Sequence, residues 1–329
     1  MLTVSCAFPP VSETPAHIAL AESLGYENAW CYDTPALQLD VWMTLARAAD
    51  RTTRIGLGPA VIIPSLRHVV TTAAAIATLF DLAPGRTNVA VGAGFTGRLA
   101  LGQRPLPLRA VRDYVIALKA LLRGEAVEVD GAFVQLLHGP GQVPAFPIDV
   151  PMLLAIGGPK SEALAAEMFD GVFTVVPRGG FDWSALMAQG TVLDEGETYD
   201  SPRVIEAGGP GAAILFHAGY EGTVAGVEDL PGAAEWRREI EKVPAEERHL
   251  RTHVGHLTTL NDTDRKVMNG ALIQAVTFSG SSEELRARLD EVARAGVTEL
   301  VYQPAGPDIE RELISFATMA GLEYSPVRR

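Results

Sequence analysis

Short apolar runs alternate with amphipathic stretches along most of this chain. Each run is followed by residues whose apolar positions recur three and four apart. This alternation is typical of parallel strands joined by crossover helices. The runs predict eight strands, over Leu2–Phe8, Asn28–Asp33, Ile55–Ile62, Thr87–Gly94, Met152–Ile156, Gly171–Val176, Ala212–His217 and Thr298–Gln303.

The helical pattern falls between these strands. It predicts helices over Thr14–Leu24, Asp40–Arg51, 68–82, Leu108–Leu122, Ser161–Phe169 and Ser282–Ala295. Eight strands with intervening helices predict a (β/α)8 TIM barrel, with a doubly wound sheet as the main alternative. We expect residues 1–329 to form this single domain.

Two segments depart from the repeat. Ala126–Leu137 is typical of a β-hairpin that turns at Asp130-Gly131. Residues from about 178 to 270 are irregular, rich in Gly, Glu and His, with a helical pattern over Ala233–Val243. In a barrel they would form an insertion at the C-terminal face, where loops build substrate pockets.

The amino-acid composition and net charge indicate which classes of binding partner are disfavoured. The 329 residues are 47% apolar and 20% charged, and 40 acidic against 27 basic residues give a net charge of −13. This balance argues against nucleic acid and anionic membranes as partners. Cys6 and Cys31 lie in apolar runs and predict buried free thiols. The start lacks a basic region, and no apolar run reaches membrane-spanning length, so we expect a soluble, cytoplasmic protein.

The most informative segment is Phe80–Arg98. A helix ends at Pro84-Gly85, a short strand follows, and a glycine-rich loop begins at Gly92. The glycines leave room for a flat, phosphorylated ligand, although a turn that needs positive φ would have the same composition. Arg98 in this loop is a candidate anion ligand or a partner for a surface acid.

A second glycine turn is Gly157-Gly158-Pro159-Lys160-Ser161. A strand ends in two glycines and a helix begins at the proline, so exposed N–H groups and the helix dipole offer a phosphate seat. The spacing is not that of a Walker loop, and a turn without a ligand stays an alternative.

Three of the seven histidines, His249, His253 and His256, would share one face of a helix. Neither a cysteine nor a carboxylate is placed to complete a metal site, so we expect no metal and favour an acid/base or hydrogen-bonding role. Asp33, at the end of the second strand, is a candidate to orient a ligand or to cap the next segment. No serine-hydrolase, zincin or dithiol motif is present.

Taken together, the segments resemble the bacterial luciferase-like superfamily of flavin- and deazaflavin-dependent oxidoreductases, with the methylenetetrahydromethanopterin reductase-like branch as the nearest likeness. The likeness covers most of the chain outside about 178–270. The residues that carry it are Ile55–Gly58, Arg67-His68, Leu82–Arg86, Gly92–Gly94, Gly157–Lys160, Glu167–Gly171 and Glu299–Pro304.

The resemblance implies a TIM barrel whose ring cofactor, a deazaflavin coenzyme of the F-420 type or FMN, lies over the third strand, often beside a non-proline cis peptide. Such a ring carries hydride. Residues placed at the cofactor by the resemblance are Ala60, Val61 and Ile62 behind the ring, Gly92 and Gly94 lining it, and Gly157, Gly158 and Ser161 at the phosphate. Thr96 and Arg98, in the loop that follows Gly94, are further candidates to bind the cofactor.

The chain also departs from the family. Some members have a histidine where this chain has Thr34, and a glutamate where it has Phe95-Thr96, so that acid/base pair does not transfer. We therefore expect His253 or His256 to supply the proton. The interpretation is an oxidoreductase acting on a small organic substrate, with an FMN-dependent monooxygenase, a non-catalytic flavin-binding barrel or an unrelated phosphate-binding barrel as alternatives. Barrels of this kind often form a homodimer through helices of the second and third units, and the apolar Ala73–Ala77 stretch fits close helix packing either within or between subunits.

Overall fold

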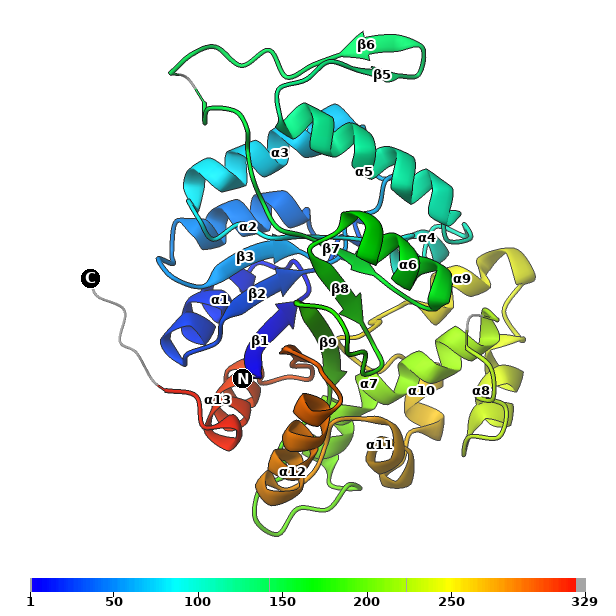
Figure 1. The fold of residues 1–329 in the computed structure, drawn as a ribbon. Coiled ribbons are helices and arrows are strands. Elements are labelled where there is room, and N and C mark those ends of the chain that lie inside the picture. Colours follow the sequence, from blue (N-terminus) through cyan, green and yellow to red (C-terminus); the bar gives the residue numbers. More distant parts are fainter. Residues whose placement is uncertain (1, 142, 223, 324–329) are drawn as a thin grey trace.

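A barrel of eight parallel strands forms the centre of the molecule (Figure 1). The computed structural model describes residues 2–323 except 142 and 223. Around the barrel the strand order is β3-β2-β1-β10-β9-β8-β7-β4. The bounds are β1 (Thr3–Phe8), β2 (Asn28–Cys31), β3 (Gly56–Pro59), β4 (Val89–Val91), β7 (Met152–Ala155), β8 (Gly171–Thr174), β9 (Ser184–Gln189) and β10 (Glu299–Gln303).

The ends of this order, β3 and β4, meet and close the barrel. Leu57 bridges to Thr87 and Ile62 bridges to Val91, both in parallel register. The Ile62 N–H donates to the Ala90 carbonyl at 2.8 Å. Closure confirms the predicted TIM barrel and excludes the doubly wound sheet, whose edges stay open.

Helices surround the barrel (Figure 1). No helix in the described part of the chain is both long and apolar enough to cross a membrane. The bounds are α1 (Thr14–Ser23), α2 (Val41–Ala49), α3 (Val69–Leu82), α4 (Phe95–Leu99), α5 (Leu108–Leu122), α6 (Pro159–Met168), α7 (Pro202–Tyr220), α8 (Ala233–Ile240), α9 (Arg248–Thr252), α10 (Asp262–Val267), α11 (Gly270–Val276), α12 (Ser282–Arg294) and α13 (Ile309–Ala320), with a 3-10 turn at Ala245–Glu247.

The prediction of a seventh strand over Ala212–His217 is wrong. These residues belong to α7, and the seventh strand is β9, which follows β8 through residues 175–183 without an intervening helix. The sequence did not indicate a helix here because α7 contains several glycines, which favour helix poorly but allow close packing against other elements. A Cβ on Gly208 would lie 2.9 Å from Ile273 Cγ2, and one on Gly211 would lie 2.6 Å from Gln189 Cβ. Close packing overrides local propensity here.

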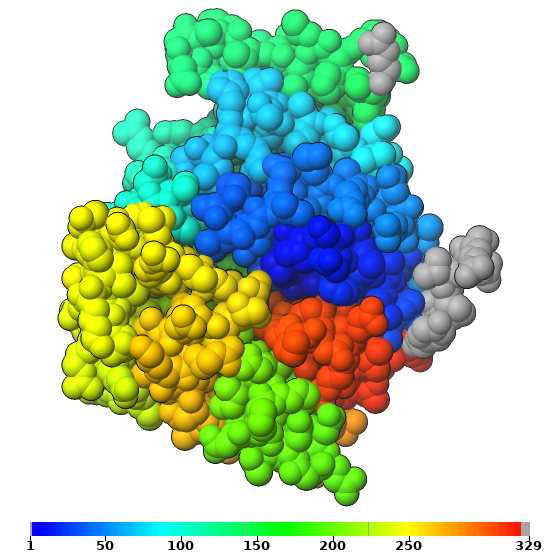
Figure 2. Space-filling model, turned by 180° about the vertical axis from the view of Figure 1, so that it is seen from behind, coloured from blue at the N-terminus to red at the C-terminus, as the bar shows by residue number. Residues whose placement is uncertain are grey.

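The long segment between β9 and α12 is helical rather than irregular. It carries α7 to α11 and its own apolar core, built around Phe216, Trp236 and Ile273. Its part near residue 250 lies on one side of the molecule in the space-filling view, coloured yellow (Figure 2). The hairpin of β5 (Val127–Val129) and β6 (Ala132–Val134) is as predicted, with Asp130 and Gly131 both at positive φ.

Candidate functional site

The C-terminal mouth of the barrel collects most of the predicted site residues. Apolar side chains fill the barrel interior below it, both small ones such as Ala60 and Ala90 and large ones such as Trp30 and Phe173. At the end of β3 the Ala60–Val61 peptide bond is cis, as the resemblance implies for the ring side of the site. Apolar residues therefore border the mouth at the end of the third strand.

The three residues expected behind the ring divide between two sides of the barrel wall. Ala60 and Val61 belong to the interior cluster, and Val61 is partly exposed. Ile62 packs instead with the helices outside, in the cluster that includes Ile76 of α3. Ala60 and Val61 are thus placed to contact a ligand at the mouth, whereas Ile62 fixes the strand end from behind.

Gly92 and Gly94 are required by packing of the β4 end against the β3 end. A Cβ on Gly92 would lie 2.6 Å from Val61 Cγ2. A Cβ on Gly94 would lie 2.6 Å from Ile63 Cγ2, and the φ of Gly94 is +83°. These glycines therefore hold Val61 and Ile63 in place, and the space that they leave is filled by protein.

The turn Gly157-Gly158 is different, because it borders open space. A Cβ built on either glycine meets no atom within 4 Å. Their N–H groups both donate to Ser161 Oγ, at 3.1 and 3.2 Å, and Ser161 Oγ donates to the Gly158 carbonyl at 2.8 Å. The turn begins α6, so the two N–H groups and the hydroxyl, which here bond within the turn, lie at a helix N-terminus, the kind of place where an anion is stabilised.

Asp33 lies just beyond β2 and is buried. Its Oδ2 accepts from Arg67, which also pairs with Asp40 at 2.7 Å, while Asp33 Oδ1 and the neighbouring Tyr32 hydroxyl are buried without a partner among the described residues. Burial raises the pKa of Asp33 above its ordinary value, and the hydrogen bond and charge of Arg67 offset only part of that rise. Two unpaired polar atoms at one strand end suit a polar ligand.

Arg98 and Thr96, both on α4, are engaged within the protein. Arg98 donates from Nε to the Arg104 carbonyl at 2.6 Å and from Nη1 to Ser65 Oγ at 2.5 Å. Thr96 Oγ1 lies 3.1 Å from His256 Nε2. The structure thus links Thr96, at the barrel mouth, to the histidine-bearing segment.

His253 and His256 lie close together and are buried with His217 of α7. His256 Nδ1 lies 2.8 Å from His217 Nδ1 and 3.4 Å from His253 Nδ1. Burial lowers the pKa of His256 well below its ordinary value, and the two neighbouring histidines lower it further. His249 is not part of this cluster. Sequence reasoning missed His217 because its segment resembled a strand, although the heavy use of histidine after residue 210 was a signal.

The histidine segment reaches the barrel itself. Leu257, which follows His256, has a φ of +68° and packs against the interior cluster. Its carbonyl accepts from Gln303 Nε2 of β10 at 2.7 Å. The insertion therefore covers part of the mouth, and its histidines lie next to the predicted cofactor site.

Two of the cavities among the described residues adjoin the barrel. One of about 440 Å³ opens at the N-terminal strand ends, away from the predicted site residues, and is lined by Asn28, Arg86 and Glu299 among others. The other, of about 350 Å³, lies between the loop after α4 and the insertion, and its walls include Glu221, His249 and Thr252. The first cavity lies at the N-terminal face, which in TIM barrels contributes to stability and not to catalysis. The second cavity borders the histidine cluster.

Comparison with known families gives one match over more than half of the chain. Residues 3–188 match the family described as luciferase-like monooxygenase. This stretch contains β1 to β8 and most of β9, and therefore both glycine segments and the cis peptide.

Individual proteins also resemble the chain over nearly its whole length. A 5,10-methylenetetrahydromethanopterin reductase from Archaeoglobus fulgidus is 26% identical, with 92% of each chain covered. The coenzyme F420 dependent tetrahydromethanopterin reductase from Methanopyrus kandleri superposes with a TM-score of 0.71 at 19% identity, covering 98% of this chain and 99% of that one. The oxygenating constituent of 3,6-diketocamphane monooxygenase from Pseudomonas putida, solved with FMN, gives a TM-score of 0.62 at 12% identity and covers 97% and 98%. At these identities the two structures support the fold.

Proposed function

The chain belongs to the luciferase-like monooxygenase family, and we propose that it is an oxidoreductase that moves hydride between a bound deazaflavin or flavin ring and a small organic substrate. The proposed reaction takes place at the C-terminal mouth of the barrel. Barrel enzymes build their sites at this face from the loops that follow the strands.

The observation that carries the proposal is the open turn Gly157-Gly158 together with the unpaired polar atoms at the other side of the mouth. The two glycines leave room for a phosphate, whose oxygens would replace Ser161 Oγ as the acceptor of their two N–H groups. Tyr32 Oη and Asp33 Oδ1 are buried and lack partners, as expected of atoms that a bound ring would satisfy. The residues present therefore fit a phosphorylated ring.

The spacing of strands supports the same arrangement. In the barrel β7, which leads to the glycine turn, is the second strand from β3, which carries Ala60 and Val61. Strands lie about 4.8 Å apart, so the two strand ends are about 10 Å apart. A five-carbon sugar-alcohol chain with its phosphate can span this distance from a ring over Val61.

Between the two cofactors we place the deazaflavin coenzyme first. The Archaeoglobus fulgidus relative and the Methanopyrus kandleri structure both carry names of methanopterin-linked reductases, and the latter is named as coenzyme F420 dependent. FMN is the second candidate, on the family description and the FMN complex. When bound, either ring accepts or donates hydride. Ala60 and Val61 would then exclude water from one face of it.

For the proton step we propose that the Thr96 hydroxyl contacts the substrate and that His256 positions it. His256 Nε2 lies 3.1 Å from Thr96 Oγ1, whose side chain is partly exposed on α4, whereas His253 Nε2 lies 2.8 Å from Glu221 and faces the insertion. His256 is thus a positioning residue that acts through the hydroxyl of Thr96. Thr96→Val should lower turnover and leave the dissociation constant of the cofactor unchanged, whereas equal turnover would refute this role.

The test of the proposed function is anaerobic oxidation of the reduced deazaflavin coenzyme, followed by the return of its absorbance. A panel of acceptors should begin with methylenetetrahydromethanopterin, because the matched relatives are named for it. We expect acceptor-dependent oxidation at catalytic enzyme concentrations. Binding without turnover across the panel, with FMN as well as deazaflavin, would favour a non-catalytic barrel instead.

We also propose a homodimer packed through α2 and α3. Met43 near the start of α2 is 71% exposed and is a candidate contact, whereas Ala73, Ile76 and Ala77 of α3 are buried in the core of the subunit and pack within it. Sedimentation should report a dimer, and Met43→Glu should shift it toward the monomer. A monomeric wild-type protein at micromolar concentration would contradict the proposal.

A further inference from the structure

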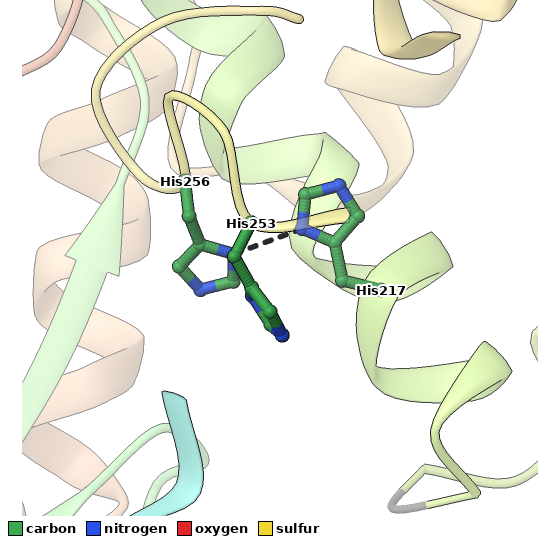
Figure 3. Close-up of side chains that lie close together, drawn as sticks. All are labelled: His217, His253 and His256. Carbon is green, nitrogen blue, oxygen red and sulfur yellow. Dashed lines mark hydrogen bonds between the residues drawn. The ribbon is translucent and has the colours of Figure 1, made fainter. Parts of the chain in front are cut away.

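Three imidazole rings converge inside the insertion, from segments far apart in the sequence (Figure 3). His217 comes from α7, His253 from the end of α9, and His256 from the turn that follows. Each is at most 3% exposed. Their Nδ1 atoms face one another, with His256 Nδ1 at 2.8 Å from that of His217 and 3.4 Å from that of His253.

The outer nitrogen of each ring is held by an oxygen. His217 Nε2 lies 3.0 Å from Asp264 Oδ1, His253 Nε2 lies 2.8 Å from Glu221 Oε1, and His256 Nε2 lies 3.1 Å from Thr96 Oγ1. A carboxylate accepts only, so His217 and His253 carry their hydrogens on Nε2. Their Nδ1 lone pairs therefore point into the cluster.

One ring hydrogen, that of His256, points into the cluster. Two lone pairs would repel at 2.8 Å, so His256 donates from Nδ1 to His217, and His256 Nε2 accepts the Thr96 hydroxyl hydrogen. Moving that one ring hydrogen to Nε2, where it can be donated to Thr96 Oγ1, frees the third lone pair. This change is a tautomer shift of His256 with rotation of the Thr96 hydroxyl, and no proton is gained or lost.

We propose that His217, His253 and His256 bind a divalent transition metal ion through their Nδ1 atoms, with Zn²⁺ the expected occupant. Nitrogens in a tetrahedral zinc site lie about 2.0–2.1 Å from the ion and hence about 3.4 Å from one another. One ring nitrogen of each histidine lies within 4.8 Å of one ring nitrogen of each of the others, and the separation of His253 Nδ1 from His256 Nδ1, 3.4 Å, already has the required value. Neutral imidazole suits zinc, copper and nickel, and a water would take the fourth position.

The charges around the cluster match a dication. Asp264 is buried, and the side chain of Glu221 is 12% exposed. In the part of the chain that the structure describes, their ion-pair partners are the histidines, and no lysine or arginine reaches them. An ion of charge +2 would balance the two carboxylates. Carboxylate–histidine–metal chains of this kind orient metal-bound imidazoles in general.

The cluster also has a path for entry and a structural consequence. Glu221 lines the cavity of about 350 Å³ beside the loop after α4, and one of its oxygens, Oε2, is buried without a partner. An ion entering there would meet Glu221 before His253. Once bound, it would tie α7 and α9 to each other and, through His256 and Thr96, to the barrel mouth. The proposed metal site would thus stabilise the insertion against the barrel, and it does not depend on the proposed cofactor.

The test measures metal on the purified full-length chain without cofactor or substrate. We expect about one Zn²⁺ per chain after dialysis, its removal by a strong chelator, and rebinding measured by competition with a chromophoric chelator. Co²⁺ on the stripped protein should give the intense visible absorption of tetrahedral coordination. His217→Gln should weaken Zn²⁺ at least tenfold and abolish this absorption, whereas His249→Gln, a matched change outside the cluster, should do neither.

Asp264→Asn keeps all three ligands and guards against a ligand variant that fails to fold. It should weaken Zn²⁺ by about 10–100-fold, as loss of a group that orients a ligand does elsewhere. No Zn²⁺ bound by the wild-type chain at micromolar concentrations, or equal affinities for His217→Gln and the wild type, would overturn the proposal. The cluster would then be a hydrogen-bonded histidine group only.

Discussion

Gly158→Ala separates the phosphate seat from the stability of the fold. The φ of Gly158 is 170°, which is extended backbone open to any residue, and its added Cβ meets nothing within 4 Å. Alanine has fewer unfolded conformations than glycine, so the free energy of unfolding should stay the same or rise by about 0.4–1 kcal/mol. The new methyl group nevertheless occupies space beside the Gly157 and Gly158 N–H groups.

The cost to cofactor binding follows from those donors. A hydrogen bond to a charged group contributes about 1.5–3 kcal/mol. Blocking one such bond to the phosphate should therefore raise the dissociation constant by about 10–150-fold, at 1.4 kcal/mol per tenfold change. The assay is a fluorescence titration with the intact cofactor, paired with thermal unfolding of the same sample.

Two controls make the experiment decisive. Ala163→Ser changes an exposed position further along α6 and should leave both affinity and stability unchanged. The ring without its phosphate should bind Gly158→Ala and wild type equally. An unchanged affinity of Gly158→Ala for the phosphorylated cofactor, with the fold intact, would refute the assignment of this turn to phosphate.

Three further predictions concern the scaffold. Gly92→Ala places a Cβ 2.6 Å from Val61 Cγ2 and should destabilise the protein by about 1–3 kcal/mol, with partial rescue by Val61→Ala, read from urea midpoints. Glu22 accepts backbone N–H bonds from residues 53–55, which outweigh burial and lower the pKa of Glu22. The Glu22 carboxylate should thus contribute its full stabilisation of the fold above about pH 4.5 and lose it as the pH falls through the lowered pKa. The difference in unfolding free energy between wild type and Glu22→Gln should therefore shrink in acid, and a difference that widened would contradict this. Glu312 is buried between Arg203 and Arg311, at 2.9 Å from each. Glu312→Gln should therefore lower the free energy of unfolding by about 3 kcal/mol, and an unchanged denaturation midpoint would refute the stabilising role of these two ion pairs.

Much of the barrel could be predicted because its strands obey local rules. Seven of the eight predicted strands overlap observed ones, and the Pro84-Gly85 end of α3 and the Asp130-Gly131 turn follow from backbone chemistry. The seventh strand could not be found in this way. The true strand, Ser184–Gln189, is short. The glycines of α7 are set by packing against side chains distant in the sequence, which local patterns do not reveal.

The site was predictable to a smaller degree. Its glycines are visible in the sequence, but the sequence does not distinguish Gly92, which meets Val61, from Gly157, which borders open space. The histidine cluster needed the tertiary fold altogether. His217 lies 39 residues before His256, and only the packing of α7 against the turn after α9 brings their rings together.

The most direct test of the central claim is a fluorescence titration of the purified chain with the deazaflavin coenzyme and with FMN. The account predicts saturable binding of at least one of them at micromolar concentrations, about −8 kcal/mol, and loss of that affinity in Gly158→Ala. If neither ligand binds below about a millimolar, about −4 kcal/mol, the barrel mouth is not a flavin-type site and the proposed function is wrong.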